Sequence, residues 1–313
     1  MNPFEGIYGN ELLCASLTDH ITAGTLPHAY ILEGPTGSGK HTLATAIACA
    51  LFPEEAKKIQ AGNCPDILPI GLNADRKSMG VDTVRALRAD ASISPNELNG
   101  KLYVISDADK MTPQAQNALL KLLEEPPRHV RFLLLCSNAG MLLPTVRSRA
   151  PVLKLQVFSK EQIASYLLHC EPKASVLQRD DAEAFNRLVR MADGCIGRAK
   201  QLLHSRRQSA APDVVAVTSL LKCLLHESKF TFMQAMSALP AKREELSAFL
   251  ISMRLAMRDI LLIKSHMLQG DLNDSGTAVA GQLQFYAQIA DAEEFAASMT
   301  DRAIVQLFTL LGR

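Results

Sequence analysis

The chain has 313 residues, a length that favours two or three domains over a single one. Its 33 Lys and Arg oppose 32 Asp and Glu, and this net charge of +1 excludes a protein held on DNA or a membrane by bulk charge alone. The seven cysteines lack the close spacing of a zinc site or a disulfide framework, and no apolar run is long enough for a membrane span. We therefore expect a soluble, cytoplasmic protein without zinc and without a membrane partner.

The first half of the chain alternates apolar, strand-like runs with helical stretches, a pattern typical of an α/β domain with a largely parallel sheet. The strands are expected at residues 29–32, 66–70, 102–106, 132–136 and 152–155. The helices are expected at 40–51, 81–91, 113–124 and near 143–148. Thr112 and Pro113 supply the N-cap and the first position of the third helix, which the following Pro126 and Pro127 bring to an end.

The strand signals fade after Leu155, and the rest of the chain has a helical pattern. Helices are expected from Ser159, at 181–192 and after Gly197. The polar segment 204–213 is typical of a linker, and the helical pattern that follows from Val214 has one sizeable break, at 270–276. We predict three domains: an α/β domain at 1–155, a small helical domain at 156–208 and a C-terminal helical bundle at 209–313.

Residues 34–40 read GPTGSGK between a predicted strand and a predicted helix, which matches the G-x-x-x-x-G-K part of a phosphate-binding loop. The glycines let backbone N–H groups turn toward a polyphosphate at the helix N-terminus, and Lys40 would reach its β- and γ-phosphates. The alternative is a glycine-rich turn with an incidental lysine. The residues predicted to contact nucleotide here are Gly34, Gly37, Ser38, Gly39, Lys40, His41 and Thr42.

The metal-binding positions that accompany such a loop are degraded. His41 stands where a Ser or Thr hydroxyl would bind Mg²⁺, and Thr42, one residue later, is rotated by about 100° on a helix. The strand at 102–106 ends in Ser106 and Asp107, where ATPases of this type have Asp and Glu. We therefore predict no metal ligand and negligible ATP hydrolysis; a shifted alignment, with Asp107 as the ligand, is the alternative.

Four segments together resemble the bacterial clamp-loader subunits of the AAA+ superfamily. They are LPHAYILEGPTGSGKHTLA at 26–44, QNALLKLLEEPP at 116–127, LLPTVRSRA at 142–150 and DGCIGRAKQLL at 193–203. The resemblance implies an AAA+ P-loop domain with a parallel sheet, followed by a small helical lid and a C-terminal helical collar. The delta-prime type of subunit fits best, because the chain keeps the loop and the arginine motif but has only Cys64 where ATPase subunits carry a four-cysteine zinc module.

The resemblance also implies roles for three residues outside the loop. Arg149 would act in trans as an arginine finger at a neighbour's ATP, with Ala150 replacing the motif cysteine. Asn138 would lie near a γ-phosphate, and Arg198 would contact nucleotide from the lid. The structural alternatives are a surface ion pair for Arg149, a strand-end turn for Asn138 and an exposed helix arginine for Arg198.

By resemblance, the chain is a DNA replication subunit of the DNA polymerase III holoenzyme that helps to load a sliding clamp onto primed DNA. Its implied partners are ATPase-type and delta-type clamp-loader subunits in a hetero-oligomer, the sliding clamp, and DNA through the complex. ATP or ADP is the implied ligand of the loop, without a well-held Mg²⁺. The alternatives are an active AAA+ ATPase, either a divergent motor subunit or a recombination factor, and a P-loop kinase, which would have no need of the C-terminal bundle.

Overall fold

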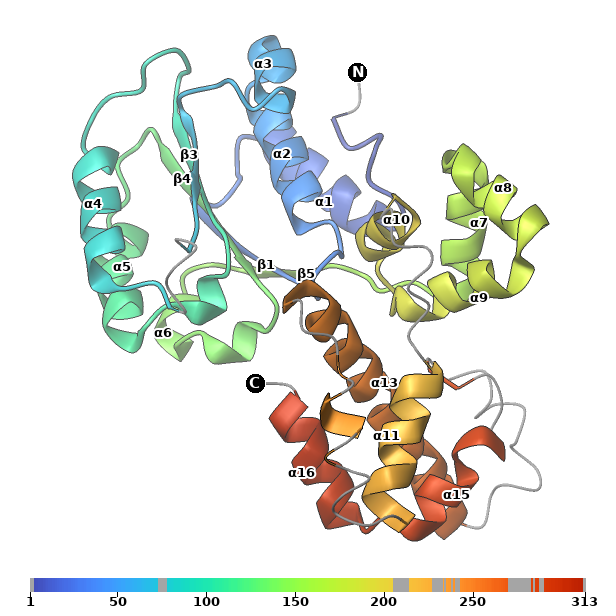
Figure 1. Cartoon of the computed structure of the whole chain (residues 1–313). Helices are drawn as coiled ribbons and strands as arrows, with labels where there is room; N and C mark the ends of the chain where they lie inside the picture. Colours follow the sequence, from blue (N-terminus) through green and yellow to red (C-terminus); the bar gives the residue numbers. More distant parts are fainter. Residues whose placement is uncertain are drawn as a thin grey trace. The chain divides into compact units, whose positions relative to one another are not determined.

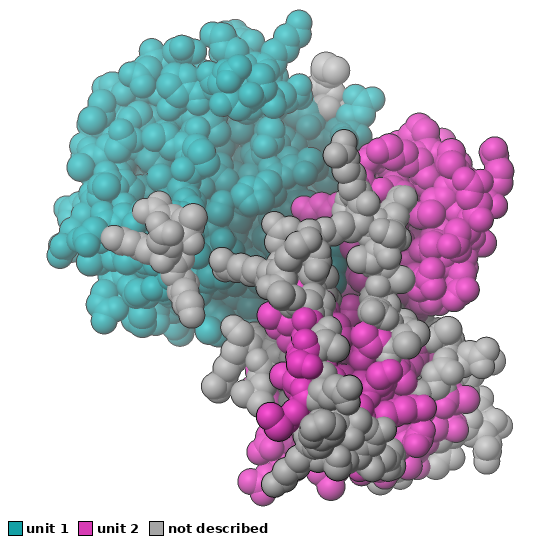
Figure 2. All heavy atoms as spheres, viewed as in Figure 1, with its two compact units in different colours: residues 1–159, 194–198 teal, residues 160–193, 199–313 magenta. Residues whose placement is uncertain are grey.

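The computed structural model describes residues 3–72, 78–204, 214–226, 233, 235–237, 239, 243–269, 283, 285–286 and 290–311 (Figure 1). The chain forms two compact units, Met1–Ser159 with Gly194–Arg198 and Lys160–Asp193 with Ala199–Arg313 (Figure 2). Most of the predicted linker at 204–213 and the predicted break at 270–276 lie outside the described residues, and the division into three domains stays a prediction.

The first unit is built on a sheet of five parallel strands in the order β2-β3-β4-β1-β5, which confirms the α/β prediction. The strands are β1 (Ala29–Glu33), β2 (Ile67–Ile70), β3 (Lys101–Ile105), β4 (Val130–Cys136) and β5 (Val152–Lys154). Strands β1, β3 and β4 read as nearly continuous apolar runs, because both faces of the sheet are covered.

Helices cover both faces of this sheet (Figure 1). They are α1 (Glu11–Thr22), α2 (Lys40–Leu51), α3 (Ala56–Gln60), α4 (Val81–Ala91), α5 (Pro113–Glu124) and α6 (Pro144–Arg147), with 3₁₀ turns η1 (Pro53–Glu55), η2 (Ala108–Lys110) and η3 (Ala139–Met141). Alternate strand residues supply the two cores: Ile31 packs with α4 and α5, whereas Leu32 packs with α1 and α2. Helix α1 was not predicted; it buries only Leu17 fully, so its apolar pattern is weak.

Every element of the second unit within its described residues is a helix. Its helices are α7 (Lys160–Cys170), α8 (Pro172–Asp180), α9 (Ala182–Met191), most of α10 (Ile196–His204), α11 (Val214–His226), α13 (Arg243–Gln269), α15 (Ala290–Ser298) and α16 (Asp301–Leu311). Side chains from α11, α13, α15 and α16 share one core, which includes Val217, Ile260 and Phe295. Within the described part of the chain, no helix combines the length and the apolar character that crossing a bilayer requires.

Candidate functional site

The loops that follow β1, β3 and β4 meet at one edge of the sheet, because the carboxyl ends of neighbouring parallel strands lie together. Three hydrogen bonds join these loops. The Gly34 amide donates to the carbonyl of Cys136 (3.1 Å), and the Ser137 amide donates to the Asp109 carboxylate (3.0 Å). The Ala139 amide donates to the Glu33 carboxylate (3.1 Å). The structure therefore brings the predicted loop at 34–40 next to the segments that contain Ser106, Asp107 and Asn138.

The loop at 34–40 joins β1 to α2 through a glycine-rich turn. Gly37 and Gly39 have positive φ angles of 86° and 95°, which glycine adopts without strain. Gly39 is the N-cap of α2, and because it has no side chain it does not cap the first N–H groups of this helix. These donors and the helix dipole make the loop suitable for an anion such as a phosphate.

Gly37 also contacts the start of α10. The Gly197 amide donates to the Gly37 carbonyl oxygen (3.0 Å), and a Cβ atom on Gly197 would lie 2.7 Å from this oxygen. A Cβ atom on Gly37 would lie 2.8 Å from the amide nitrogen of Arg198. Both glycines are therefore required for this close approach, which holds the backbone of Arg198 against the loop.

Lys40 anchors the loop from within. Its ammonium group donates to the carbonyl oxygens of Gly34 (2.5 Å) and Pro35 (3.0 Å). Burial lowers the pKa of Lys40, and the negative charges of Asp109 and Asp107 partly oppose this effect. Because an ammonium has three donors, one remains for a ligand oxygen.

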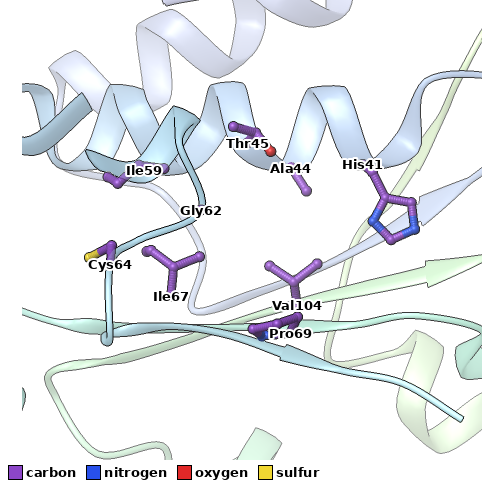
Figure 3. A pocket seen from close by; sticks show the side chains of 9 residues that line it. All are labelled: His41, Ala44, Thr45, Ile59, Gly62, Cys64, Ile67, Pro69 and Val104. Atoms are coloured by element: carbon purple, nitrogen blue, oxygen red, sulfur yellow. The ribbon is translucent and has the colours of Figure 1, made fainter. Parts of the chain in front are cut away.

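The positions next to the loop where a metal ligand would be expected are exposed or engaged in other contacts. His41 and Thr42 are exposed, and His41 lines one end of a pocket of about 180 Å³ that has Cys64 at its other end (Figure 3). The Asp107 carboxylate pairs with Lys110 at 3.3 Å. Among the described residues, no three His, Cys, Asp or Glu side chains are grouped to hold a metal ion.

Sequence reasoning missed two carboxylates at this edge. Asp109 accepts the Ser137 hydrogen bond through Oδ2, while its Oδ1 is buried and has no hydrogen-bond partner among the described residues. Glu33 is the last residue of β1. Its carboxylate accepts the hydrogen bond from the Ala139 amide and also pairs with the ammonium group of Lys154 in β5 (3.6 Å). A polar residue that ends an apolar strand was the only signal for Glu33, and it is a weak one.

The Asn138 side chain acts within its own loop. Its Oδ1 accepts a hydrogen bond from the Gly140 amide (2.8 Å) and so caps the turn η3. This contact fits the alternative of a strand-end turn, and a place for Asn138 near a γ-phosphate stays a prediction. Asn138 is exposed, at the end of the strand next to β1.

Arg149 contacts a different part of the domain. Its guanidinium pairs with Glu124 at the end of α5 (Nη2 to Oε1, 2.7 Å) and donates from Nη1 to the carbonyl of Thr145 (3.0 Å) and the hydroxyl of Ser148 (3.3 Å). The side chain is 34% exposed, while the following Ala150 is fully buried in the core. The short helix α6 thus presents Arg149 at the surface of the domain.

Helix α5 also fixes the start of α6. The buried Gln116 side chain accepts a hydrogen bond from the Leu143 amide (2.7 Å) and donates one to the Met111 carbonyl (3.2 Å). Gln116 and Glu124 both belong to the segment 116–127 that carried the family resemblance. The two motifs at 116–127 and 142–150 are therefore in direct contact.

The sheet and its glycine-rich loop define an AAA+ P-loop domain. The model of a protein family described as "DNA polymerase III, delta subunit" matches residues 9–159. Among curated relatives, the DNA polymerase III subunit gamma of Buchnera aphidicola (Schizaphis graminum strain) is 29% identical over 212 residues, or 64% of this chain and 57% of that protein. The subunit gamma/tau of Mycobacterium tuberculosis is 30% identical over 234 residues, or 71% and 40%.

These matches confirm that the chain resembles the clamp-loader family of AAA+ proteins. The chain spans 57% of the length of the Buchnera gamma subunit and 40% of the mycobacterial gamma/tau subunit. Among solved structures, a DNA polymerase III gamma-subunit-related protein from Thermotoga maritima is 18% identical, with 95% of this chain and 97% of that chain covered and a TM-score of 0.41.

Proposed function

We propose that the chain is a delta-prime-type subunit of a DNA polymerase III clamp loader, and that it supplies Arg149 to ATP bound by a neighbouring ATPase subunit. The observation that carries this proposal is the position of Arg149, which is held by α5 and α6 at the domain surface and pairs with no residue of its own phosphate loop. A guanidinium has a permanent charge and can stabilise phosphate charge across a subunit boundary.

The chain's own loop fits a nucleotide but not its metal ion. Lys40, Gly37 and Gly39 form a phosphate cradle that needs no metal, so ATP or ADP is the proposed ligand. His41 lacks the oxygen that Mg²⁺ prefers, and Asp107 is paired with Lys110. We therefore assign this subunit a role as a scaffold and activator rather than as a motor.

The proposed partners follow from this role. They are ATPase-type and delta-type clamp-loader subunits in a cytoplasmic hetero-oligomer, the sliding clamp, and primed DNA through the assembled complex. The helices from Val214 onward would join those of other subunits in a collar. Their own core, which includes Val217 and Ile260, supports the fold of this region, and exposed apolar residues such as Leu250 are available for contacts with other subunits.

The experiment that tests the proposal is Arg149→Ala in a reconstituted clamp loader. A trans arginine contributes on the order of 10³–10⁵ to the rate at its own site, so the neighbouring site is expected to lose its hydrolysis. DNA-dependent ATP hydrolysis by the whole complex should fall, while assembly is unchanged. Arg147→Ala, at an exposed arginine two residues earlier, is the matched control. Undiminished hydrolysis by an assembled Arg149→Ala complex would contradict the proposal.

A second candidate function is an active AAA+ ATPase. The complete sequence from Gly34 to Lys40, with its lysine in place, is the observation that favours it. Hydrolysis by the isolated chain distinguishes the two functions, because a scaffold subunit needs no turnover of its own.

A further inference from the structure

Glu124 occupies a position where a carboxylate does not help its own helix. It is the last residue of α5, and a helix C-terminus carries partial negative charge. The neighbouring Glu125 adds a second carboxylate at the same end. The contact that compensates Glu124 is Arg149, 25 positions later in the chain and 2.7 Å from its carboxylate. The helix α5 itself therefore gives no reason for an acidic residue at this position.

The contacts of Arg149 fix its guanidinium without using all of its donors. Glu124 takes one N–H of Nη2, while Thr145 and Ser148 accept from Nη1. A guanidinium has five N–H donors, so Nε–H and the second N–H of Nη2 remain for another ligand. Three contacts thus restrain the side chain, and the remaining two donors have no contact of this kind among the described residues.

We propose that Glu124 is a positioning residue for Arg149, which it holds in the orientation that a neighbour's phosphate requires. This inference rests on the proposed function of Arg149. A long arginine side chain loses much rotamer freedom when it binds, and a partner that orders it beforehand lowers this cost at the reacting site. Simple stabilisation of the fold explains the pair less well, because its side chains are 34% and 46% exposed and such pairs contribute little to folding.

The test uses full-length chain in the reconstituted clamp loader with primed DNA and ATP. Glu124→Ala is expected to lower the kcat of DNA-dependent hydrolysis on the order of tenfold, with the KM for ATP nearly unchanged, because the arginine is misplaced rather than absent. Glu124→Gln keeps an oxygen acceptor and should retain more activity. Glu125→Ala is the matched control, since it removes the adjacent exposed carboxylate of the same segment.

A double variant separates positioning from a merely structural role. If Glu124 acts through Arg149, then Glu124→Ala with Arg149→Ala should have the same rate as Arg149→Ala alone. A further loss in the double variant, an equal loss from Glu125→Ala, or an unchanged kcat for Glu124→Ala would overturn the inference. If Arg149→Ala lowers hydrolysis but Glu124→Ala does not, only this inference fails. If Arg149→Ala itself has no effect, the proposed function fails.

Discussion

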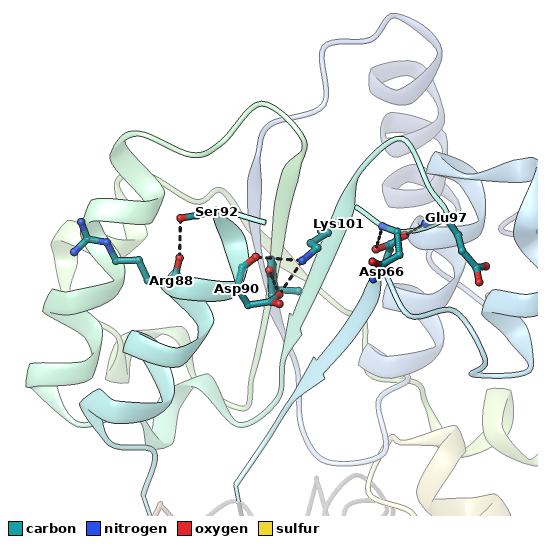
Figure 4. Close-up of polar contacts among 8 residues, drawn as sticks. Asp66, Arg88, Asp90, Ser92, Glu97 and Lys101 are labelled. Atoms are coloured by element: carbon teal, nitrogen blue, oxygen red, sulfur yellow. Dashed lines mark hydrogen bonds and ion pairs between the residues drawn. The ribbon is translucent and has the colours of Figure 1, made fainter. Parts of the chain in front are cut away.

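At the scale of single residues, Asp66 shows how one side chain holds the loop at 96–98, which precedes β3 (Figure 4). Asp66 is fully buried, and its carboxylate accepts backbone hydrogen bonds from Asn96 (2.8 Å), Glu97 (2.7 Å) and Leu98 (2.8 Å). Burial alone would raise the pKa of Asp66, but these three donors and the charge of Lys101 outweigh it and hold the pKa below its ordinary value. The charged form is therefore the one that the folded domain stabilises.

We expect Asp66→Ala to lower the free energy of unfolding by about 2–4 kcal/mol, because it leaves three backbone donors without their acceptor. Asp82→Ala is the matched control. The Asp82 side chain is 81% exposed and pairs with Arg85 on the surface, so its loss should cost less than about 1 kcal/mol. Urea unfolding of both variants measures the difference, and equal midpoints would contradict the role given to Asp66.

The same carboxylate gives a dependence on pH. Because the pKa of Asp66 is lower in the folded chain than its unfolded value of about 3.9, its contribution is complete above that value and is lost as the pH falls through the folded pKa. Asp90, whose pKa is lowered chiefly by the hydrogen bond from Tyr103, acts in the same direction. Asp66→Asn should therefore flatten the acid side of the stability profile, and a profile identical to that of the parent chain would contradict this.

At the scale of elements, the loop at 34–40 with helix α2 is expected to bind nucleotide without turning it over. A fluorescent ATP analogue should bind the isolated chain, and Lys40→Ala should lower its affinity. Lys40 supplies the positive charge of the loop and donates hydrogen bonds to the carbonyl groups of Gly34 and Pro35. Lys57→Ala, an exposed lysine of α3, is the control. Hydrolysis near the median enzyme rate of about 10 per second, abolished by Lys40→Ala, would contradict this and favour an active ATPase.

The elements that could be predicted from the sequence are those whose signals are local. Helix α5 begins and ends where expected, because Thr112 caps it through the Ala115 amide and two prolines follow its end. The roles of Glu33 and Asp109 could not be predicted, because each depends on which strands become neighbours in the sheet. The pair of Glu124 with Arg149 has the same origin: both motifs were recognised, but their contact arises only when α5 and α6 pack together.

At the scale of the whole molecule, the two units have separate hydrophobic cores. The two cores on the sheet draw their residues from the first unit, and the core around α13 draws its residues from the second. The second unit has its own buried carboxylate, Asp259, which accepts hydrogen bonds from the amides of Phe285 (2.7 Å) and Tyr286 (3.1 Å). Asp66 and Asp259 therefore have the same role in different units, since each buried carboxylate accepts hydrogen bonds from backbone amides of its own unit.

This separation predicts that the units unfold in distinguishable steps, since a chain with independent cores need not unfold as one cooperative body. Hydrogen exchange in rising urea can follow each unit, with peptides from β4 reporting on the first and peptides from α13 on the second. Asp66→Ala should accelerate exchange in β4 alone, and Asp259→Ala should do so in α13 alone, each by the equivalent of about 2–4 kcal/mol. Asp301→Ala, whose side chain is 64% exposed, is the control for the second unit. If either buried variant destabilised both sets of peptides equally, the chain would be a single cooperative body and the two cores would not be independent.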